Sequence, residues 1–167
     1  MRRGCVILLA VVCLWLGNAK ESQAGVYLNG SLGGNYSLSV SPKSKFEKLG
    51  GNFELSLGYE LKFIVGVSFE AAVLFDVLKK ELLVRPGMRL HFAMFYVRFA
   101  APLAFYFDEN ADGWNMGALL GLGAKIGVPM TGLSFFGEVN ITPYFIKIDT
   151  MGLLMPIEMR LGVSYAF

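Results

Sequence analysis

The chain has 167 residues, 54% of them hydrophobic, and its mean hydropathy is +0.52. This length suits one domain, and a net charge of +2 gives no basic surface of the kind that nucleic-acid binding requires. Both cysteines, Cys5 and Cys13, lie at the amino terminus, so the rest of the chain has no disulfide framework, metal thiolate or cysteine nucleophile. The composition favours residence in a membrane.

The first 24 residues are typical of a secretory signal peptide. Arg2 and Arg3 precede an apolar run over residues 5–16, and Ser22 and Ala24 have the small-residue spacing of a signal-peptidase site. We expect cleavage after Ala24, with Ala19 as the alternative, because the apolar run is short for a membrane-spanning helix of about 20 residues. Residues 1–24 hold three of the 15 basic and one of the 13 acidic residues, so the remainder is neutral.

The remaining residues, 25–167, alternate between apolar and polar with a period of two. Between Val26 and Val40 the even positions are mostly apolar and the odd positions mostly polar, which predicts a strand rather than a helix. The pattern recurs, and the predicted strands cover residues 26–40, 52–59, 63–75, 84–92, 97–107, 114–124, 133–145 and 153–167. No later run of 18 residues is both apolar and uncharged, and lipid admits only helices or closed barrels. We therefore predict an all-β, eight-stranded antiparallel up-and-down transmembrane barrel.

The connections between these strands alternate in length. Longer polar segments are expected at residues 41–51, 76–82, 108–113 and 147–152, and tight turns near 61–62, 93–95 and 127–131. Long outer loops and short periplasmic turns are typical of bacterial barrels. Both termini would then lie on the periplasmic side.

The last residues carry a recognisable pattern. Arg160, Gly162, Tyr165 and Phe167 fill the positions polar-x-Gly-x-x-apolar-x-apolar, which resembles the carboxy-terminal assembly signal of Gram-negative outer-membrane barrels. The chain is similar to the small eight-stranded members of that family, such as the transmembrane domain of OmpA, OmpX and NspA. The resemblance implies insertion by the barrel-assembly machinery, and contact with outer-membrane lipid and lipopolysaccharide. A soluble lipocalin-like barrel, with its apolar side inward, is the structural alternative.

Charged residues on the polar face should fill the interior, because eight strands enclose just enough room for side chains. Acidic and basic residues balance there, and the predicted lumen network is Glu54, Glu70, Arg85, Arg89, Arg98, Glu138, Glu158 and Arg160, with Glu60 and Lys125 also inward. Buried charges require partners, so we expect ion pairs, and hairpin geometry places Glu70 opposite Arg89 and Glu138 opposite Arg160. A conducting polar path is the alternative.

Three other features are candidate sites. His91 is the single histidine, but Ala93 stands where the outer-membrane lipid A deacylases and acyltransferases carry serine, so we expect a hydrogen-bonded structural residue. Asp108, Asn110 and Asp112 match the start of a calcium loop, although Leu119 replaces the bidentate glutamate and the same residues make ordinary turns. Residues 41–48 form a basic segment that could contact lipopolysaccharide phosphates or remain solvated.

Aromatic residues are expected to anchor the barrel as two girdles at the membrane interfaces. The outer girdle would comprise Phe53, Phe75, Phe107, Trp114 and Phe145, and the inner girdle Tyr59, Phe63, Phe92, Tyr165 and Phe167. We predict a monomeric, non-enzymatic outer-membrane protein with a structural or interaction role, no cofactor and no nucleic-acid partner. The alternatives are a narrow channel for small solutes, a lipid A modifying enzyme and an adhesin.

Overall fold

The computed structural model describes residues 25–40, 47–62, 65–77, 81–106, 114–144 and 153–167. Within them the elements are β1 (Gly25–Val40), β2 (Glu47–Lys62), β3 (Gly66–Asp76), β4 (Glu81–Phe92), β5 (Phe95–Ala100), β6 (Leu103–Tyr106), β7 (Trp114–Met116), β8 (Leu119–Gly127), β9 (Leu133–Ile141) and β10 (Leu153–Ala166). The predicted signal peptide, the candidate calcium residues and the girdle residues Phe63, Phe107 and Phe145 lie outside the described residues. No helix of the described part is long and apolar enough to cross a membrane.

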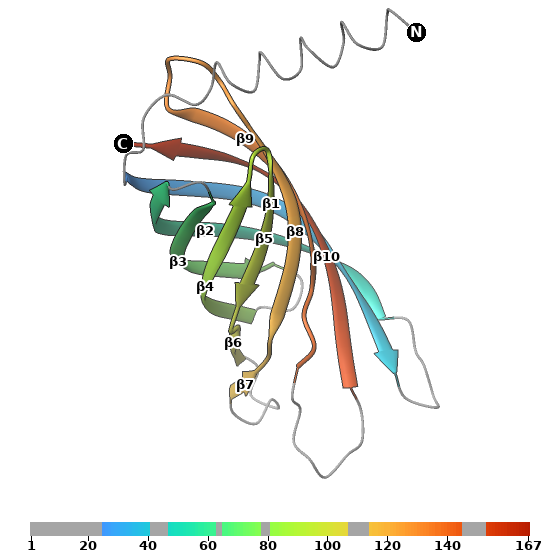
Figure 1. The fold of residues 1–167 in the computed structure, drawn as a ribbon. Coiled ribbons are helices and arrows are strands. Elements are labelled where there is room, and N and C mark those ends of the chain that lie inside the picture. Colours follow the sequence, from blue (N-terminus) through green and yellow to red (C-terminus); the bar gives the residue numbers. More distant parts are fainter. Residues whose placement is uncertain (1–24, 41–46, 63–64, 78–80, 107–113, 145–152) are drawn as a thin grey trace, which may run out of the picture.

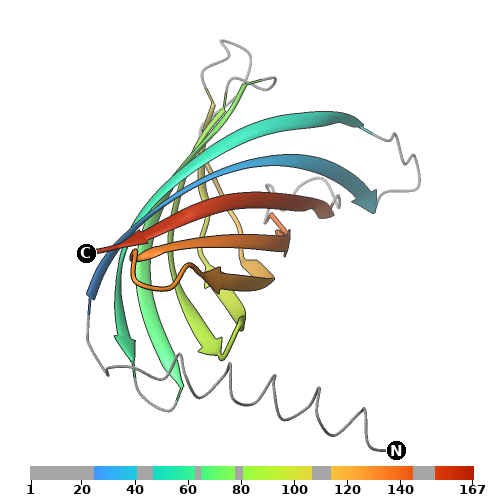
Figure 2. The same ribbon diagram turned by 90° about the horizontal axis from the view of Figure 1, so that it is seen from above.

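The ten strands form one closed antiparallel barrel (Figures 1 and 2). Its wall has eight staves, where a stave is one crossing of the wall: β5 and β6 together make one stave, β7 and β8 together make another, and each other strand is a stave by itself. β5 and β6 follow one another along the same side of β4, and both pair with it. On their other side, β5 pairs with β8 and β6 pairs with β7. The pairing of β1 with β10 closes the wall, and the amide of Phe167 donates a hydrogen bond to the carbonyl of Val26 at 3.0 Å. The predicted eight-stranded, all-β barrel is confirmed.

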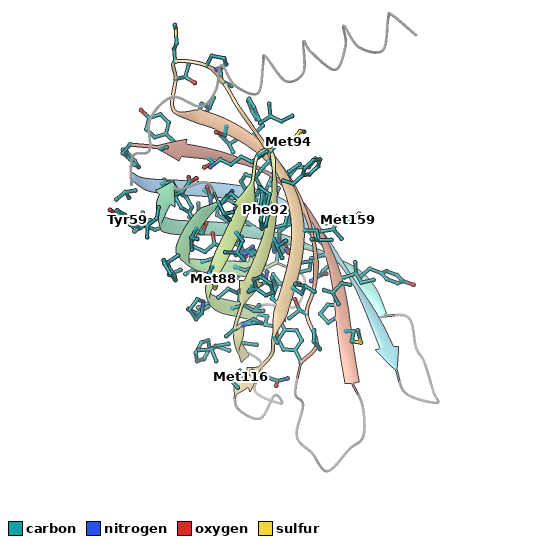
Figure 3. The ribbon with its side chains drawn as sticks, viewed as in Figure 1. Tyr59, Met88, Phe92, Met94, Met116 and Met159 are labelled. Carbon is teal, nitrogen blue, oxygen red and sulfur yellow. The ribbon has the colours of Figure 1, made fainter. Side chains whose placement is uncertain are left out.

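Most apolar side chains of the described strands face outward. On β3 buried and exposed residues alternate from Ser68 to Asp76, as strand geometry requires. Leu161 on β10 is 75% exposed, and Tyr59, Phe92 and Met159 project from the outside of the wall in Figure 3. A soluble barrel would turn these side chains inward, so the lipocalin-like alternative is excluded.

Several strand ends differ from the sequence expectation. β2 begins at Glu47, within the predicted loop 41–51, because β1 supplies pairing partners for Gly50 and Gly51. Glycines have no side chain, so the alternation of apolar and polar residues could not reveal this part of the strand. β9 ends at Ile141 rather than near 145, because Pro143 has no amide hydrogen to donate to the ladder. The turn between β8 and β9 spans residues 128–132, one residue later than the predicted 127–131, and holds Met130 and Gly132 at φ of 67°.

Candidate functional site

The interior of the barrel brings the eight predicted network residues together. They come from β2, β3, β4, β5, β9 and β10, and all are buried: Glu54, Glu70, Arg85, Arg89, Arg98, Glu138, Glu158 and Arg160. Four guanidinium groups face four carboxylates, so the set is neutral. Its ion pairs form two connected layers along the lumen.

The layer nearer the predicted outer loops, which we call the outer layer, is a ring of alternating charges. Arg85 forms two hydrogen bonds with Glu158, of 2.8 and 2.5 Å, and its Nη1 lies 3.2 Å from Glu54 Oε2. Arg160 closes the ring, with Nη1 3.2 Å from Glu54 and Nη2 3.2 Å from Glu158. Each cation therefore contacts both carboxylates, which is the arrangement that limits the penalty of burying charge.

The inner layer is centred on Arg98. Its Nη1 lies 2.9 Å from Glu54 and 2.7 Å from Glu138, and its Nε lies 2.6 Å from Glu70. Arg89 contacts Glu70 at 3.1 Å and Glu138 at 3.5 Å. Arg98 thus contacts three carboxylates and, through Glu54, joins the two layers.

Aromatic rings complete the surroundings of Arg89. Its guanidinium carbon lies 4.9 Å from the ring centre of Tyr96 and 5.4 Å from that of Phe136. Both rings present π-electron density to the cation, which compensates for part of its lost hydration.

The predicted hairpin register around Glu70 is wrong. Glu70 lies opposite Gly87, and Arg89 lies opposite Ser68, so the β3–β4 hairpin is centred earlier than the charge pattern indicated. Glu70 and Arg89 still form an ion pair, because diagonal neighbours on adjacent strands are within reach of long side chains.

The predicted register of Glu138 opposite Arg160 is the one observed. The ion pairs described for Arg160 are nevertheless with Glu54 and Glu158. The side chain crosses Gly33 on β1, where an added Cβ would lie 2.8 Å from Arg160 Cγ, and it donates to Asn52 Oδ1 at 2.8 Å. Glycine therefore provides the space through which arginine reaches the second strand away.

A repeated three-strand motif supports the inner layer, and the sequence analysis missed it. In each copy a tyrosine ring covers a directly opposite glycine, and the hydroxyl donates to a glutamate on the third strand. The two copies are Tyr27, Gly58 and Glu70, with a hydrogen bond of 3.3 Å, and Tyr96, Gly123 and Glu138, with one of 2.9 Å. The sequence did show glycines at inward-facing positions among polar residues. Only the strand register, however, shows which glycine lies opposite which tyrosine.

Between the charged layers and the predicted outer loops, part of the interior is lined by apolar side chains. Leu74, Leu83, Ala104 and Tyr144 form a buried apolar cluster on the outer-loop side of Arg85. These residues occupy inward positions that the alternating pattern reserves for polar side chains. We call this set the apolar tier.

Other predicted residues lie around the inner end. The ring nitrogen Nε2 of His91 is 3.1 Å from the hydroxyl of Ser68, which is fully buried, and the ammonium of Lys125 lies 5.5 Å from the ring centre of Tyr27. The rings of Tyr165 and Phe167 meet edge to face at 5.0 Å. In the described ranges no three histidine, cysteine or acidic residues gather in a way that could hold a metal ion.

Comparisons with known proteins bear on the fold. No protein-family model matches the chain, and neither does any curated protein. Among solved structures it is similar to Neisserial surface protein A (NspA), with 14% identity, a TM-score of 0.56, and coverage of 87% of this chain and 99% of that one. It is also similar to the N-terminal β-barrel domain of Pseudomonas aeruginosa OprF (17% identity, TM-score 0.46, coverage 83% and 97%) and to Ail of Yersinia pestis (16%, 0.47, 85% and 99%). The similarity to NspA establishes that this chain has the fold of the small eight-stranded outer-membrane barrels, as the carboxy-terminal resemblance predicted.

Proposed function

We propose that the chain is an integral outer-membrane protein of a Gram-negative bacterium, with a closed, charge-paired interior and a structural or interaction role. The observation that carries this proposal is the burial of the central cations. Arg85 and Arg98 are 0% exposed and Arg160 is 2% exposed, so solvent scarcely reaches them. A conducting path would need continuous water along these same groups.

The cost of separating the charges favours a permanently closed lumen, a plug, over a lumen that opens and closes. Separating one charge from such a network leaves its partner buried and unpaired, which costs about 3–5 kcal/mol. Arg98 contacts three carboxylates, so moving it would disturb both layers at once. The network therefore stabilises one closed arrangement of the lumen.

The membrane location is supported by the outer surface of the wall. Its exposed side chains are apolar over β1, β9 and β10, and hydrocarbon is the solvent that such a surface requires. Residues 1–24 would direct export. Arg160, Gly162, Tyr165 and Phe167 would be read by the barrel-assembly machinery, after which the barrel stands as a monomer among lipid and lipopolysaccharide.

The interior disfavours a lipid A modifying enzyme. Hydrolysis of a lipid would require a reachable nucleophile, and the hydroxyl of Ser68 beside His91 is fully buried. A strain lacking the gene should therefore keep an unchanged lipid A mass profile. A lipid A species that disappears with the gene and returns with it would support the enzyme instead.

Single-channel recording in planar bilayers tests the plug. The protein should give no discrete conductance steps, whereas a variant that shortens an ion pair in each layer, Arg85→Ser with Glu158→Ser and Arg98→Ser with Glu138→Ser, should conduct because it removes bulk and charge from both layers. Heat-modifiable migration on gels would verify that both proteins are folded. Steps of similar size from both proteins would overturn the proposal.

A further inference from the structure

A groove crosses the outer face of the wall where β1, β10 and β9 lie side by side (Figure 1). Its volume is about 790 Å³, and it is open on the side away from the lumen. Its floor is backbone, because the side chains of Glu138 and Arg160 point inward to the charged layers. Six outward-facing residues surround this floor in two rows of directly paired positions: Leu32, Leu161 and Gly137, then Gly34, Met159 and Val139.

Each row lacks one side chain, and the two gaps lie at diagonally opposite corners. At Gly34 an added Cβ would meet nothing closer than the carbonyl oxygen of Gly50 at 3.6 Å, and at Gly137 it would lie 3.3 Å from Leu161. Leu161 is 75% exposed and Met159 is 65% exposed, and Met159 projects from the wall in Figure 3. A narrow, extended molecule can therefore enter at Gly34, pass between these two side chains and leave at Gly137.

The strand registers give the direction of this passage. Followed from Leu32 through β10, β9, β8 and β5, the rungs of the ladder reach Phe92 at the inner end of β4. Followed from Leu32 through β2 and β3, they reach Leu82 near the outer end of the same strand. The rungs therefore run toward the inner end of the barrel in the direction from β1 to β9, which is also the direction from Gly34 to Gly137.

The passage is nearly parallel to the barrel axis. Between Gly34 and Gly137 it crosses two strand spacings, about 10 Å, and advances two residues toward the inner end, about 7 Å, so it is inclined about 55° to the strands. The strands of a small barrel are themselves tilted from the axis by about 35–45°, here in the same sense. The groove therefore follows the axis to within about 10–20°, at the level of the charged layers in the middle of the wall.

Lipid acyl chains are the molecules that lie along the membrane normal at this depth. A chain that is already in hydrocarbon gains no hydrophobic free energy from the wall, so binding depends on closer van der Waals contact. In the groove a chain contacts Leu161 on one flank, Met159 on the other and backbone beneath, whereas a flat wall offers one side. Because the groove is aligned with the chain, this contact requires no bend in the chain.

We infer that the groove is a binding site for one acyl chain of a phospholipid. The inference rests on the membrane location proposed above, and goes beyond it by assigning a lipid ligand to one place on the wall. Phospholipid is favoured over lipid A because phosphate-rich headgroups are held by basic residues. The outward positions of β1, β9 and β10 that the structure describes carry none.

Native mass spectrometry of the folded protein tests this site. Released from detergent micelles that contain phospholipid and lipid A at equal concentration, the protein should retain one phospholipid. Gly34→Leu together with Gly137→Leu extends side chains across both ends of the groove, and should lower the share of lipid-bound protein about threefold or more. Ala71→Leu, which adds bulk to the outer face of β3 away from the groove, is the matched control and should leave that share unchanged.

Equal retention by the groove variant and the unaltered protein, or retention of lipid A in place of phospholipid, would overturn the inference. A dimer that the groove variant loses would also overturn it, because the groove would then belong to a second copy of the chain. If the double variant fails to fold, Leu161→Ala, which removes one flank, should lower retention, and unchanged retention would count against the site. Protein that folds into vesicles yet retains no phospholipid would overturn the groove alone and leave the membrane location standing.

Discussion

At the scale of single residues, the interior cations differ in how many partners depend on them. Arg98 contacts the carboxylates of Glu54, Glu70 and Glu138, whereas the ion pairs described for Arg89 are with Glu70 and Glu138. The carboxylates of Arg89 therefore keep a partner when Arg89 is lost. Those of Arg98 keep one too, but losing Arg98 weakens three carboxylates at once and removes the link between the two layers.

Replacing Arg98 by Met should lower the free energy of unfolding by about 3–5 kcal/mol, because it leaves excess negative charge at the junction of the two layers. Arg89→Met should lower it less. Equilibrium unfolding in urea, with the protein in lipid vesicles, measures both. A larger loss for Arg89→Met would contradict the central position assigned to Arg98.

Which residues would carry these charges could be predicted from the sequence, but their partners could not. Alternation alone places Glu138 and Arg160 inside, and a hairpin centre even places them opposite each other. Arg160 reaches Glu54 instead, two staves away, because the side chain passes over Gly33. Partner choice thus depends on side-chain reach and on glycine gaps, which a pattern of apolar and polar positions does not encode.

At the scale of one strand, β9 separates the outer and inner faces. Val139 is 44% exposed on the outside of the wall, and its neighbour Glu138 is 3% exposed in the lumen. Arginine at Val139 should cost about 2–4 kcal/mol, as for a charge placed on the lipid side near mid-membrane. Glu138→Gln should destabilise through Arg98 and Tyr96, without changing lipid contact.

Probes attached to cysteine separate these two effects. Labels at Val139 and Ile141 should report hydrocarbon, and labels at Glu138 and Asn140 should not. Because both natural cysteines precede residue 25, single-cysteine variants of residues 25–167 carry no second thiol. Lipid contact at Glu138 in place of Val139 would reverse the assignment of the two faces.

Strand faces were predictable from the period of two, but strand ends were not. Alternation is a property of side chains, whereas an end is decided by backbone donors and by the neighbouring strand. Pro143 ends β9 and Gly50–Gly51 continue β2, and neither outcome follows from hydropathy. The same limit applies to Pro86, Pro102, Pro143 and Pro156, which are scattered in the sequence and come to lie on neighbouring strand interfaces only when the strands are placed in register.

At the scale of the whole molecule, closure depends on the two terminal strands. β1 and β10 pair from Tyr27–Ala166 to Val40–Leu153, and the last amide, that of Phe167, donates to Val26. A closed barrel was predictable because a neutral, apolar chain without a spanning helix must pair every strand in lipid. The division of its interior into charged layers and an apolar tier was not, since Leu74 and Leu83 interrupt the polar face without changing its period.

Phe167 is predicted to act in assembly more than in the stability of the finished barrel. It lies at the end of β10, 76% exposed, and contacts Tyr165, so its removal deletes one backbone hydrogen bond and one edge-to-face contact. Those losses amount to about 1–3 kcal/mol, which a closed eight-stranded wall should tolerate. Purified protein lacking Phe167 should therefore fold into lipid vesicles almost as completely as the full chain.

In cells the same deletion should sharply reduce insertion into the outer membrane, because it removes an apolar position of the assembly signal. Ala166→Gly, which changes the neighbouring residue but none of the signal positions, is the control and should insert normally. Heat-modifiable migration of membrane fractions measures insertion, and the same gel assay measures folding in vesicles. Normal insertion without Phe167 would contradict the signal. Failure in both settings would instead assign Phe167 to closure of the barrel through Val26.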